Sequence, residues 1–269
     1  MLYKKIFFDE DDKDAYIEIY VSERIDKLTR KGIIVIPGGG YHTVCAEREG
    51  EPIAMAFLPY GYNAFVLHYT VNKAPFPSQL IQASKAIKHI KDNAEEYNID
   101  ADNIFVVGFS AGGHLAASLG TMWNMNDIYA NLDMPFGYNK PKGMMLIYPV
   151  ISTEHHKVSF DNLLMNENPS KKILELCSIE KQVSDKTCPA FILHSSNDQV
   201  VNVKNSLAMA NALSENGIKY EMHIYPDAPH GVALGNEITK CGVDKWCNES
   251  IAEWVRFATK WADYVIKEG

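Results

Sequence analysis

Five short, almost continuous apolar runs recur along the chain and constrain its fold more than any other feature. They occupy residues 32–37, 63–69, 104–108, 144–148 and 190–194. Strands that are covered by helices on both faces of a sheet show this pattern, because neither face meets water. A further run, residues 219–225, alternates apolar and polar side chains and predicts one more strand.

Segments with the spacing of amphipathic helices separate these runs, at residues 49–58, 78–97, 111–123, 203–216 and 245–266. Connections of this length allow successive strands to run parallel. Residues 3–8 and 16–21 alternate instead around an acidic turn, residues 9–14, which predicts an antiparallel hairpin at a sheet edge. The expected class is therefore α/β, with a mostly parallel twisted sheet, helices on both faces and an N-terminal antiparallel hairpin.

The chain has 269 residues without a Gly/Ser linker, a charge block or a repeat, so we expect a single domain, residues 1–269. Residues 151–187 interrupt the alternation. They are rich in polar residues and contain one weak helical pattern, at residues 170–178. Because this segment follows a strand whose carboxyl end borders the expected ligand site, we expect it to form a cap or lid.

Charge and composition exclude some classes of partner. Lys and Arg number 26 against 34 Asp and Glu, so the net charge is −8, the wrong sign for neutralising the phosphates of nucleic acid or an anionic membrane. No export signal is expected from the first ten residues, where acids soon interrupt the apolar stretch. Five cysteines without CxxC spacing fit reduced thiols, and we expect a cytoplasmic location.

Gly108-Phe109-Ser110-Ala111-Gly112 matches the pattern G-x-S-x-G, with an apolar run before it and a helical segment after it. A tight strand-to-helix turn holds such a serine in a strained conformation with its hydroxyl above the sheet, and glycines two residues away avoid clashes. Ser110 is therefore the candidate nucleophile. The alternative is a glycine-rich turn that only packs a helix close to a strand.

The Pro37-Gly38-Gly39-Gly40-Tyr41 loop follows the run at residues 32–37 and corresponds in place to the H-G-G-G loop of lipases and esterases. Acyl transfer needs preorganised N–H donors for the tetrahedral oxygen, and we assign these to the amides of Gly39, Gly40 and Ala111. The alternative, phosphate binding, is disfavoured because neither GxGxxG nor a P-loop ending is present.

Chain order selects the base and the acid that a serine nucleophile needs. His230 lies on the loop after residues 219–225, and Asp198 lies on the loop after residues 190–194. Together with Ser110 they give the order Ser, acid, His that hydrolases of this kind show. Asp227, three residues before His230, is a less suitable acid because it is less able to reach the far ring nitrogen.

Substrate could also be bound by side chains close to the candidate serine. Tyr41 and Phe109 are expected to offer a platform for a sugar, although an aromatic side chain belongs more often to a core, and His114 lies one helical turn after Ser110. No ligand spacing such as HExxH is present, so we expect neither a metal nor another cofactor.

Beyond these motifs, the chain resembles bacterial α/β-hydrolases of the acetylxylan-esterase-like, carbohydrate-esterase group. The resemblance covers nearly the whole chain and includes PGGGY at 37–41, REGEPIA at 48–54, GFSAGGHLAASLG at 108–120, YPVIS at 148–152 and PHG at 229–231. It implies the α/β-hydrolase fold and a serine esterase that often acts on acetyl groups of sugars. Ser110, Asp198 and His230 match the triad of that family.

The expected function is hydrolysis of small acyl esters, O-acetyl above all, on xylo-oligosaccharides or related sugars through an acyl-enzyme. The expected partner is a small-molecule or oligosaccharide ester, and a homo-oligomer stays open. A general short-chain carboxylesterase, a peptidase of the same fold and a non-catalytic protein on this fold are the alternatives.

Overall fold

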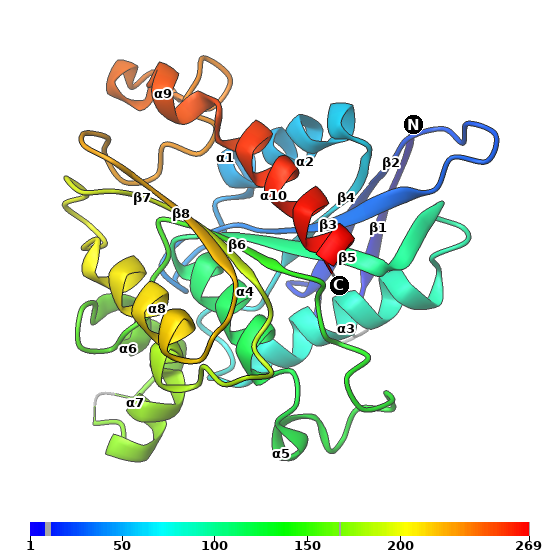
Figure 1. Cartoon of the computed structure of the whole chain (residues 1–269). Coiled ribbons are helices and arrows are strands. Elements are labelled where there is room, and N and C mark those ends of the chain that lie inside the picture. The colour runs from blue at the N-terminus through cyan, green and yellow to red at the C-terminus, as the bar shows by residue number, and fades with distance from the viewer. Residues whose placement is uncertain (9–11, 167, 269) are drawn as a thin grey trace.

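A single eight-stranded sheet forms the centre of the computed structural model, which describes residues 1–8, 12–166 and 168–268 (Figure 1). The strand order is β1-β2-β4-β3-β5-β6-β7-β8. The strands are β1 (Leu2–Phe7), β2 (Tyr16–Val21), β3 (Arg30–Ile36), β4 (Tyr62–His68), β5 (Ile99–Phe109), β6 (Met144–Ile147), β7 (Ala190–Ser195) and β8 (Tyr220–Tyr225). Each predicted strand is therefore present.

The predicted hairpin lies at one edge of this sheet. β1 pairs antiparallel with β2, from Leu2 opposite Val21 to Phe7 opposite Tyr16, and β2 pairs antiparallel with β4. Strands β4 to β8 are joined by parallel pairings. The expected α/β class is confirmed, while residues 9–11 of the acidic turn lie outside the described residues.

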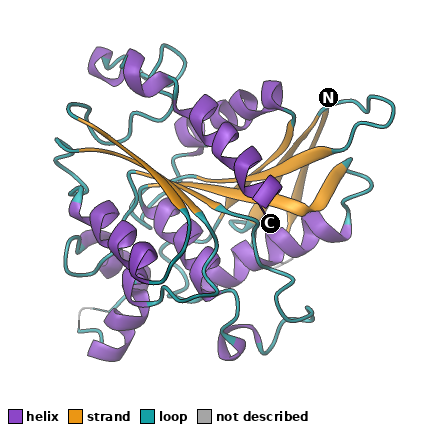
Figure 2. Cartoon of the chain, in the orientation of Figure 1, coloured by secondary structure: helices purple, strands orange, loops and turns teal. Residues whose placement is uncertain are grey.

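Helices cover both faces of the sheet (Figure 2). α2 (Glu51–Phe57) and α10 (Trp254–Glu268) pack on one face, and α3 (Ser78–Asp92), α4 (Ala111–Met122) and α8 (Lys204–Glu215) pack on the other. The buried side chains form one apolar core on each side, as the continuous apolar runs require. The short elements are α1 (Ala46–Glu49), η1 (Leu58–Tyr60), α5 (Asn126–Tyr129), α6 (Val158–Leu164), α7 (Lys171–Cys177), η2 (Ile179–Lys181), η3 (Asp244–Trp246) and α9 (Glu249–Ala252).

Several helical predictions differ from the structure. The helix predicted over residues 78–97 ends at Asp92, and residues 49–58 are divided between the end of α1, α2 and the start of η1. The segment predicted as one helix over residues 245–266 is divided into η3, α9 and α10, where Asn248 caps α9 by accepting the amides of Ser250 and Ile251. Residues 151–187 contain α6 as well as the expected helix, here α7, which begins after the N-cap Ser170. α6 is only seven residues long, too short for a clear period in the sequence.

In the described ranges, no helix combines the length and the apolar character needed to cross a bilayer. The loops that matter for the site follow β3, β5, β6, β7 and β8. Because β3 and β5 to β8 run parallel, these loops gather at one edge of the sheet.

Candidate active site

Ser110 lies in the tight turn between β5 and α4, with φ 52° and ψ −117°. This positive φ is a strained conformation for a serine. A Cβ atom added at Gly108 would lie 2.2 Å from the Gly112 carbonyl oxygen, and one at Gly112 would lie 2.1 Å from the Ile36 carbonyl oxygen. The close approach of helix and strand therefore explains why glycines flank Ser110.

A chain of hydrogen bonds joins the three predicted residues. His230 Nδ1 lies 2.6 Å from Asp198 Oδ2, and His230 Nε2 lies 2.9 Å from Ser110 Oγ. Because a carboxylate only accepts, Nδ1 carries the proton and the serine hydroxyl donates to Nε2. The rival acid, Asp227, accepts a hydrogen bond from Asn197 at 2.9 Å instead.

Asp198 is held by two loop amides and by two histidines. Its Oδ1 accepts the amides of Val200 and Val201 at 2.8 and 2.9 Å, and Oδ2 lies 3.4 Å from His194 Nε2. Burial alone would raise the pKa of this carboxyl, but the hydrogen bonds from His194, His230 and the Val201 amide outweigh it. The pKa of Asp198 lies well below its usual range, so the side chain is a carboxylate at neutral pH.

The glycine loop after β3 borders Ser110. Gly39 and Gly40 have φ of 125° and 65°, and a Cβ at Gly39 would lie 2.1 Å from the Thr43 carbonyl oxygen. Within the described part of the chain, the amides of Gly39 and Gly40 donate to no other group. Ala111 is the first residue of α4, so its amide has no partner within the helix either. These amides are available to a bound oxygen.

A cavity of about 360 Å³ opens over Ser110 and His230. This is near the lower end of the volumes that ligand pockets show. Residues 151–187 supply part of its wall, and Asn162 of α6 donates to the Gly40 carbonyl oxygen at 2.8 Å. The lining residues are Gly39, Gly40, Cys45, Arg48, Glu49, Ser110, His156, Val158, Ser159, Val200, Val201 and His230.

The structure places Tyr41, Phe109 and His114 in the core rather than at this cavity. Tyr41 and His114 are each 1% exposed, and the Tyr41 hydroxyl lies 2.7 Å from His114 Nδ1. Phe109 is fully buried between Tyr148 and Trp254. None of the three is among the residues that line the cavity, since their side chains point into the core instead.

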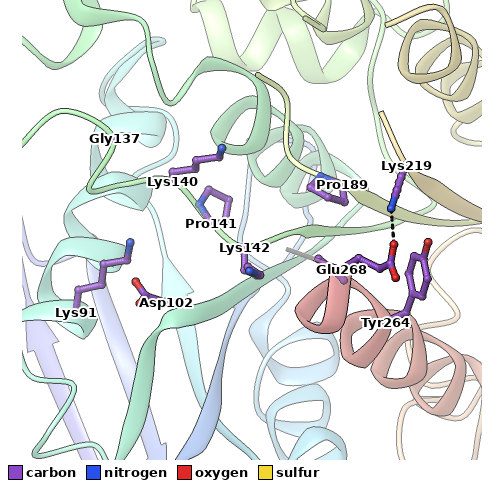
Figure 3. Close-up of a pocket in the computed structure, with 11 residues that line it drawn as sticks. Lys91, Asp102, Gly137, Lys140, Pro141, Lys142, Pro189, Lys219, Tyr264 and Glu268 are labelled. Atoms are coloured by element: carbon purple, nitrogen blue, oxygen red, sulfur yellow. Dashed lines mark hydrogen bonds and ion pairs between the residues drawn. The ribbon is translucent and has the colours of Figure 1, made fainter. Parts of the chain in front are cut away.

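A second cavity, of about 630 Å³, lies at the opposite edge of the sheet, near the amino ends of β6, β7 and β8 (Figure 3). Lysines and acids line it together, and Lys219 is paired with Glu268 at 2.9 Å. Among the described residues at this cavity there is no serine, cysteine or histidine. Although it is the larger of the two, its lining contains no hydrogen-bonded serine, histidine and carboxylate like those that join at Ser110.

Sequence reasoning missed three polar side chains at the edge of the site. Glu49, Arg48 and Tyr148 are joined to one another and to the loops that carry the predicted residues. Arg48 and Glu49 begin the REGEPIA stretch that carried part of the resemblance. The sequence therefore marked these two residues as typical of the family but did not indicate what their side chains contact.

Two models of known protein families match parts of this chain. The BD-FAE family model matches residues 17–213, and the model of the dienelactone hydrolase family matches residues 175–255. A solved structure, that of an acetyl ester-xyloside bifunctional hydrolase from Caldicellulosiruptor lactoaceticus, superposes with a TM-score of 0.83 at 33% identity, covering 97% of this chain and 96% of that one.

Two curated relatives extend the similarity. Endo-1,4-beta-xylanase B of Butyrivibrio fibrisolvens is 38% identical over 221 residues, which are 79% of this chain and 34% of that protein. An acetylxylan esterase of Xylanibacter ruminicola is 28% identical over 211 residues, 76% of this chain and 42% of that protein. The chain thus spans less than half the length of either relative. On the family match and the full-length structural similarity, the chain belongs to the BD-FAE family of α/β hydrolases, with ester hydrolases among its relatives.

Proposed function

We propose that this chain is a serine esterase that removes small acyl groups, acetyl above all, from xylo-oligosaccharides or related sugars. The observation that carries the proposal is the hydrogen-bonded series Ser110, His230 and Asp198. It opens into a cavity bordered by two glycine amides that have no partner among the residues the structure describes. A serine hydroxyl needs such a base to act as a nucleophile at neutral pH.

In the first half-reaction, Ser110 Oγ attacks the ester carbonyl carbon while His230 Nε2 takes the hydroxyl proton. The carboxylate of Asp198 stabilises the imidazolium that forms. The oxyanion accepts hydrogen bonds from the amides of Gly39, Gly40 and Ala111. The sugar oxygen then leaves with the proton of His230, and the acyl group remains on Ser110.

In the second half-reaction, water takes the place of the sugar. His230 removes a proton from this water, which attacks the acyl carbon, and the same amides hold the second oxyanion. The acid departs when Ser110 Oγ recovers its proton from His230. Atoms and protons balance in this sequence of steps without a cofactor.

The size of the cavity and the names of relatives support the choice of substrate. A volume of about 360 Å³ favours a short acyl group. The relatives include an acetylxylan esterase and an acetyl ester-xyloside hydrolase. We also propose the cytoplasm as the location, because all five cysteines are free thiols, and a sugar ester rather than nucleic acid or membrane as the partner.

A second candidate, a short-chain carboxylesterase without a requirement for sugar, has one observation in its favour. Val158, Val200 and Val201 line the cavity, and the first two are 64% and 62% exposed. Apolar side chains at the mouth would accept an alcohol group of many kinds.

The test compares acetate release from acetylated xylo-oligosaccharides with hydrolysis of para-nitrophenyl acetate and butyrate. For Ser110→Ala we expect kcat to fall at least about 1,000-fold on every substrate, because the nucleophile is lost. Ser118→Ala makes the same change further along α4, where Ser118 only donates to the His114 carbonyl oxygen, and should retain activity. Hydrolysis of the nitrophenyl esters alone would favour the second candidate, and an unaffected Ser110→Ala would refute both.

A further inference from the structure

We propose that Glu49 is a positioning residue that fixes the glycine loop and the His230 loop relative to each other, with Arg48 as its partner. The inference rests on the proposed function, because it concerns the same site. Glu49 is the last residue of α1 and is 2% exposed. A buried carboxylate is costly to desolvate unless its oxygens are hydrogen-bonded or paired, so its partners show what it holds.

One oxygen of Glu49 holds the glycine loop. Oε2 accepts the Gly38 amide at 2.8 Å. Gly38 packs directly on the nucleophile turn, since a Cβ atom added there would lie 2.7 Å from the Phe109 carbonyl oxygen and 2.9 Å from Ser110 Cβ. The next two amides along the loop are those of Gly39 and Gly40. A shift of Gly38 would therefore move the proposed oxyanion donors relative to Ser110.

The other oxygen of Glu49 reaches the His230 loop through Tyr148. Oε1 accepts the Tyr148 hydroxyl at 2.9 Å, and this hydroxyl in turn accepts the Ala233 amide at 3.0 Å. The Tyr148 ring also packs edge-on against the His230 ring, with centroids 4.9 Å apart. The phenol thus supports both the base and the chain that follows it.

Arg48 makes a parallel connection to the same loop. Its Nη1 donates to the Gly231 carbonyl oxygen at 2.5 Å, and its Nη2 lies 3.6 Å from Glu49 Oε1. The guanidinium packs on Trp246, 4.3 Å from the ring centroid, which restricts where it can point. The glycine loop is therefore connected to the chain after His230 in two ways. Arg48 contacts Gly231 directly, and Glu49 reaches Ala233 through the Tyr148 hydroxyl.

Only a carboxylate satisfies both connections. Gly38 and Tyr148 each donate to Glu49, and a carboxylate offers two accepting oxygens. A glutamine offers one oxygen and one NH₂ group, so it could keep the Gly38 contact only by presenting a donor to the Tyr148 hydroxyl. Because displacements of about 1 Å at a reacting centre can cost on the order of 100-fold in rate, loss of this arrangement should reduce kcat.

The experiment measures kcat and KM for para-nitrophenyl acetate and the rate of labelling of Ser110 by a fluorophosphonate. For Glu49→Gln we expect kcat and the labelling rate to fall about 10- to 100-fold, with KM within about threefold of wild type, because the substitution keeps the size of the side chain at the cavity but displaces the oxyanion donors and His230 relative to Ser110. Tyr148→Phe keeps the ring against His230 but breaks the connection to Glu49, and should lose about fivefold in kcat. The double variant should resemble Glu49→Gln, since both changes break the same connection.

Glu18→Gln is the matched control. Glu18 of β2 also accepts tyrosine hydroxyls, from Tyr3 at 3.1 Å and Tyr20 at 3.2 Å, but does not line the cavity. It should change kcat less than twofold. A folded Glu49→Gln variant with wild-type kcat, or losses in Glu49→Gln and Tyr148→Phe that multiply in the double variant, would overturn the inference. If Glu49→Gln does not fold, an unchanged kcat in Tyr148→Phe overturns it. A wild-type protein that neither hydrolyses the ester nor takes the label would instead refute the proposed function.

Discussion

At the scale of single residues, the partners of Asp198 fix both the charge and the orientation of its carboxylate. Two loop amides occupy one oxygen, and the other oxygen faces both His194 and His230. These partners lower the pKa of the carboxyl and fix its direction. The negative charge is therefore present and aimed at His230 before any substrate binds.

Replacing this carboxylate tests its role with almost no change of shape. In Asp198→Asn the amide group would favour the wrong tautomer of His230, so we expect kcat for para-nitrophenyl acetate to fall on the order of 10,000-fold. Asp227→Asn is the control, since Asp227 contacts Asn197 rather than His230. A large loss in Asp227→Asn, with little in Asp198→Asn, would assign the acid to the other carboxylate.

The sequence allowed Ser110, Asp198 and His230 to be selected because their order along the chain and their places after strands restrict the choice. It could not identify Glu49 or Tyr148, whose contact joins residues 99 positions apart and depends on how two loops pack. Tyr41, Phe109 and His114 were expected at the substrate for a related reason. Proximity along the chain does not show whether a side chain points into a cavity or into the core.

At the scale of elements, the contact between α4 and the end of β3 depends on the absence of a side chain at Gly112. A Cβ atom there would lie 2.1 and 2.4 Å from the carbonyl oxygens of Ile36 and Pro37. These atoms belong to the backbone at the end of β3, so they cannot move aside as a flexible side chain would. The turn that presents Ser110 and the loop that presents the glycine amides are thus packed backbone against backbone.

Because of this contact, whether Gly112→Ala raises or lowers the free energy of unfolding tests the packing. In an unhindered helix, Gly→Ala stabilises by about 1 kcal/mol. For Gly112→Ala we expect the opposite, a loss of about 1 to 3 kcal/mol in the free energy of unfolding measured with urea, together with loss of esterase activity. Gly217→Ala, where the added Cβ meets open space, should leave activity intact. A stabilised, active Gly112→Ala protein would show that the helix can move away from the strand.

The elements themselves were predictable to different degrees. All eight strands follow from apolar runs or alternation, because burial on one or both faces leaves a clear pattern. α6 was not predicted, since seven residues in a polar segment give two turns at most. Whether residues 151–187 act as a lid stays a prediction, although α6 contacts the glycine loop through Asn162.

At the scale of the whole molecule, His114 ties the sheet-covering helix α4 to residues 151–187. The Cys177 carbonyl oxygen can only accept, so His114 Nε2 carries a proton and donates to it at 2.8 Å, while Nδ1 accepts the Tyr41 hydroxyl. The ring is 1% exposed, and burial lowers its pKa from 6.5 to about 4. His114 is therefore neutral in the folded protein at pH values where it is charged in the unfolded chain.

This difference makes stability depend on pH. As the pH falls from 6.5 to about 4, the unfolded chain binds a proton at His114 that the folded protein does not, so the free energy of unfolding falls. The contribution is about 1.4 kcal/mol per pH unit in this window and vanishes above it. Urea unfolding of wild type and His114→Gln at pH 7.5, 6.0 and 5.0 measures it as a difference in slope, since the other histidines are common to both proteins. Equal slopes would contradict the assignment.

The connections within the site span most of the chain, and this has a consequence for folding. Arg48 and Gly231 are 183 residues apart, and Ser110 and His230 are 120 apart. Contacts of such sequence separation form slowly, because long segments must be ordered before they are made. During synthesis, Ser110 and the glycine loop emerge long before His230. The Ser110–His230 hydrogen bond can therefore form only after β8 has joined the sheet, so the candidate site is completed late in folding.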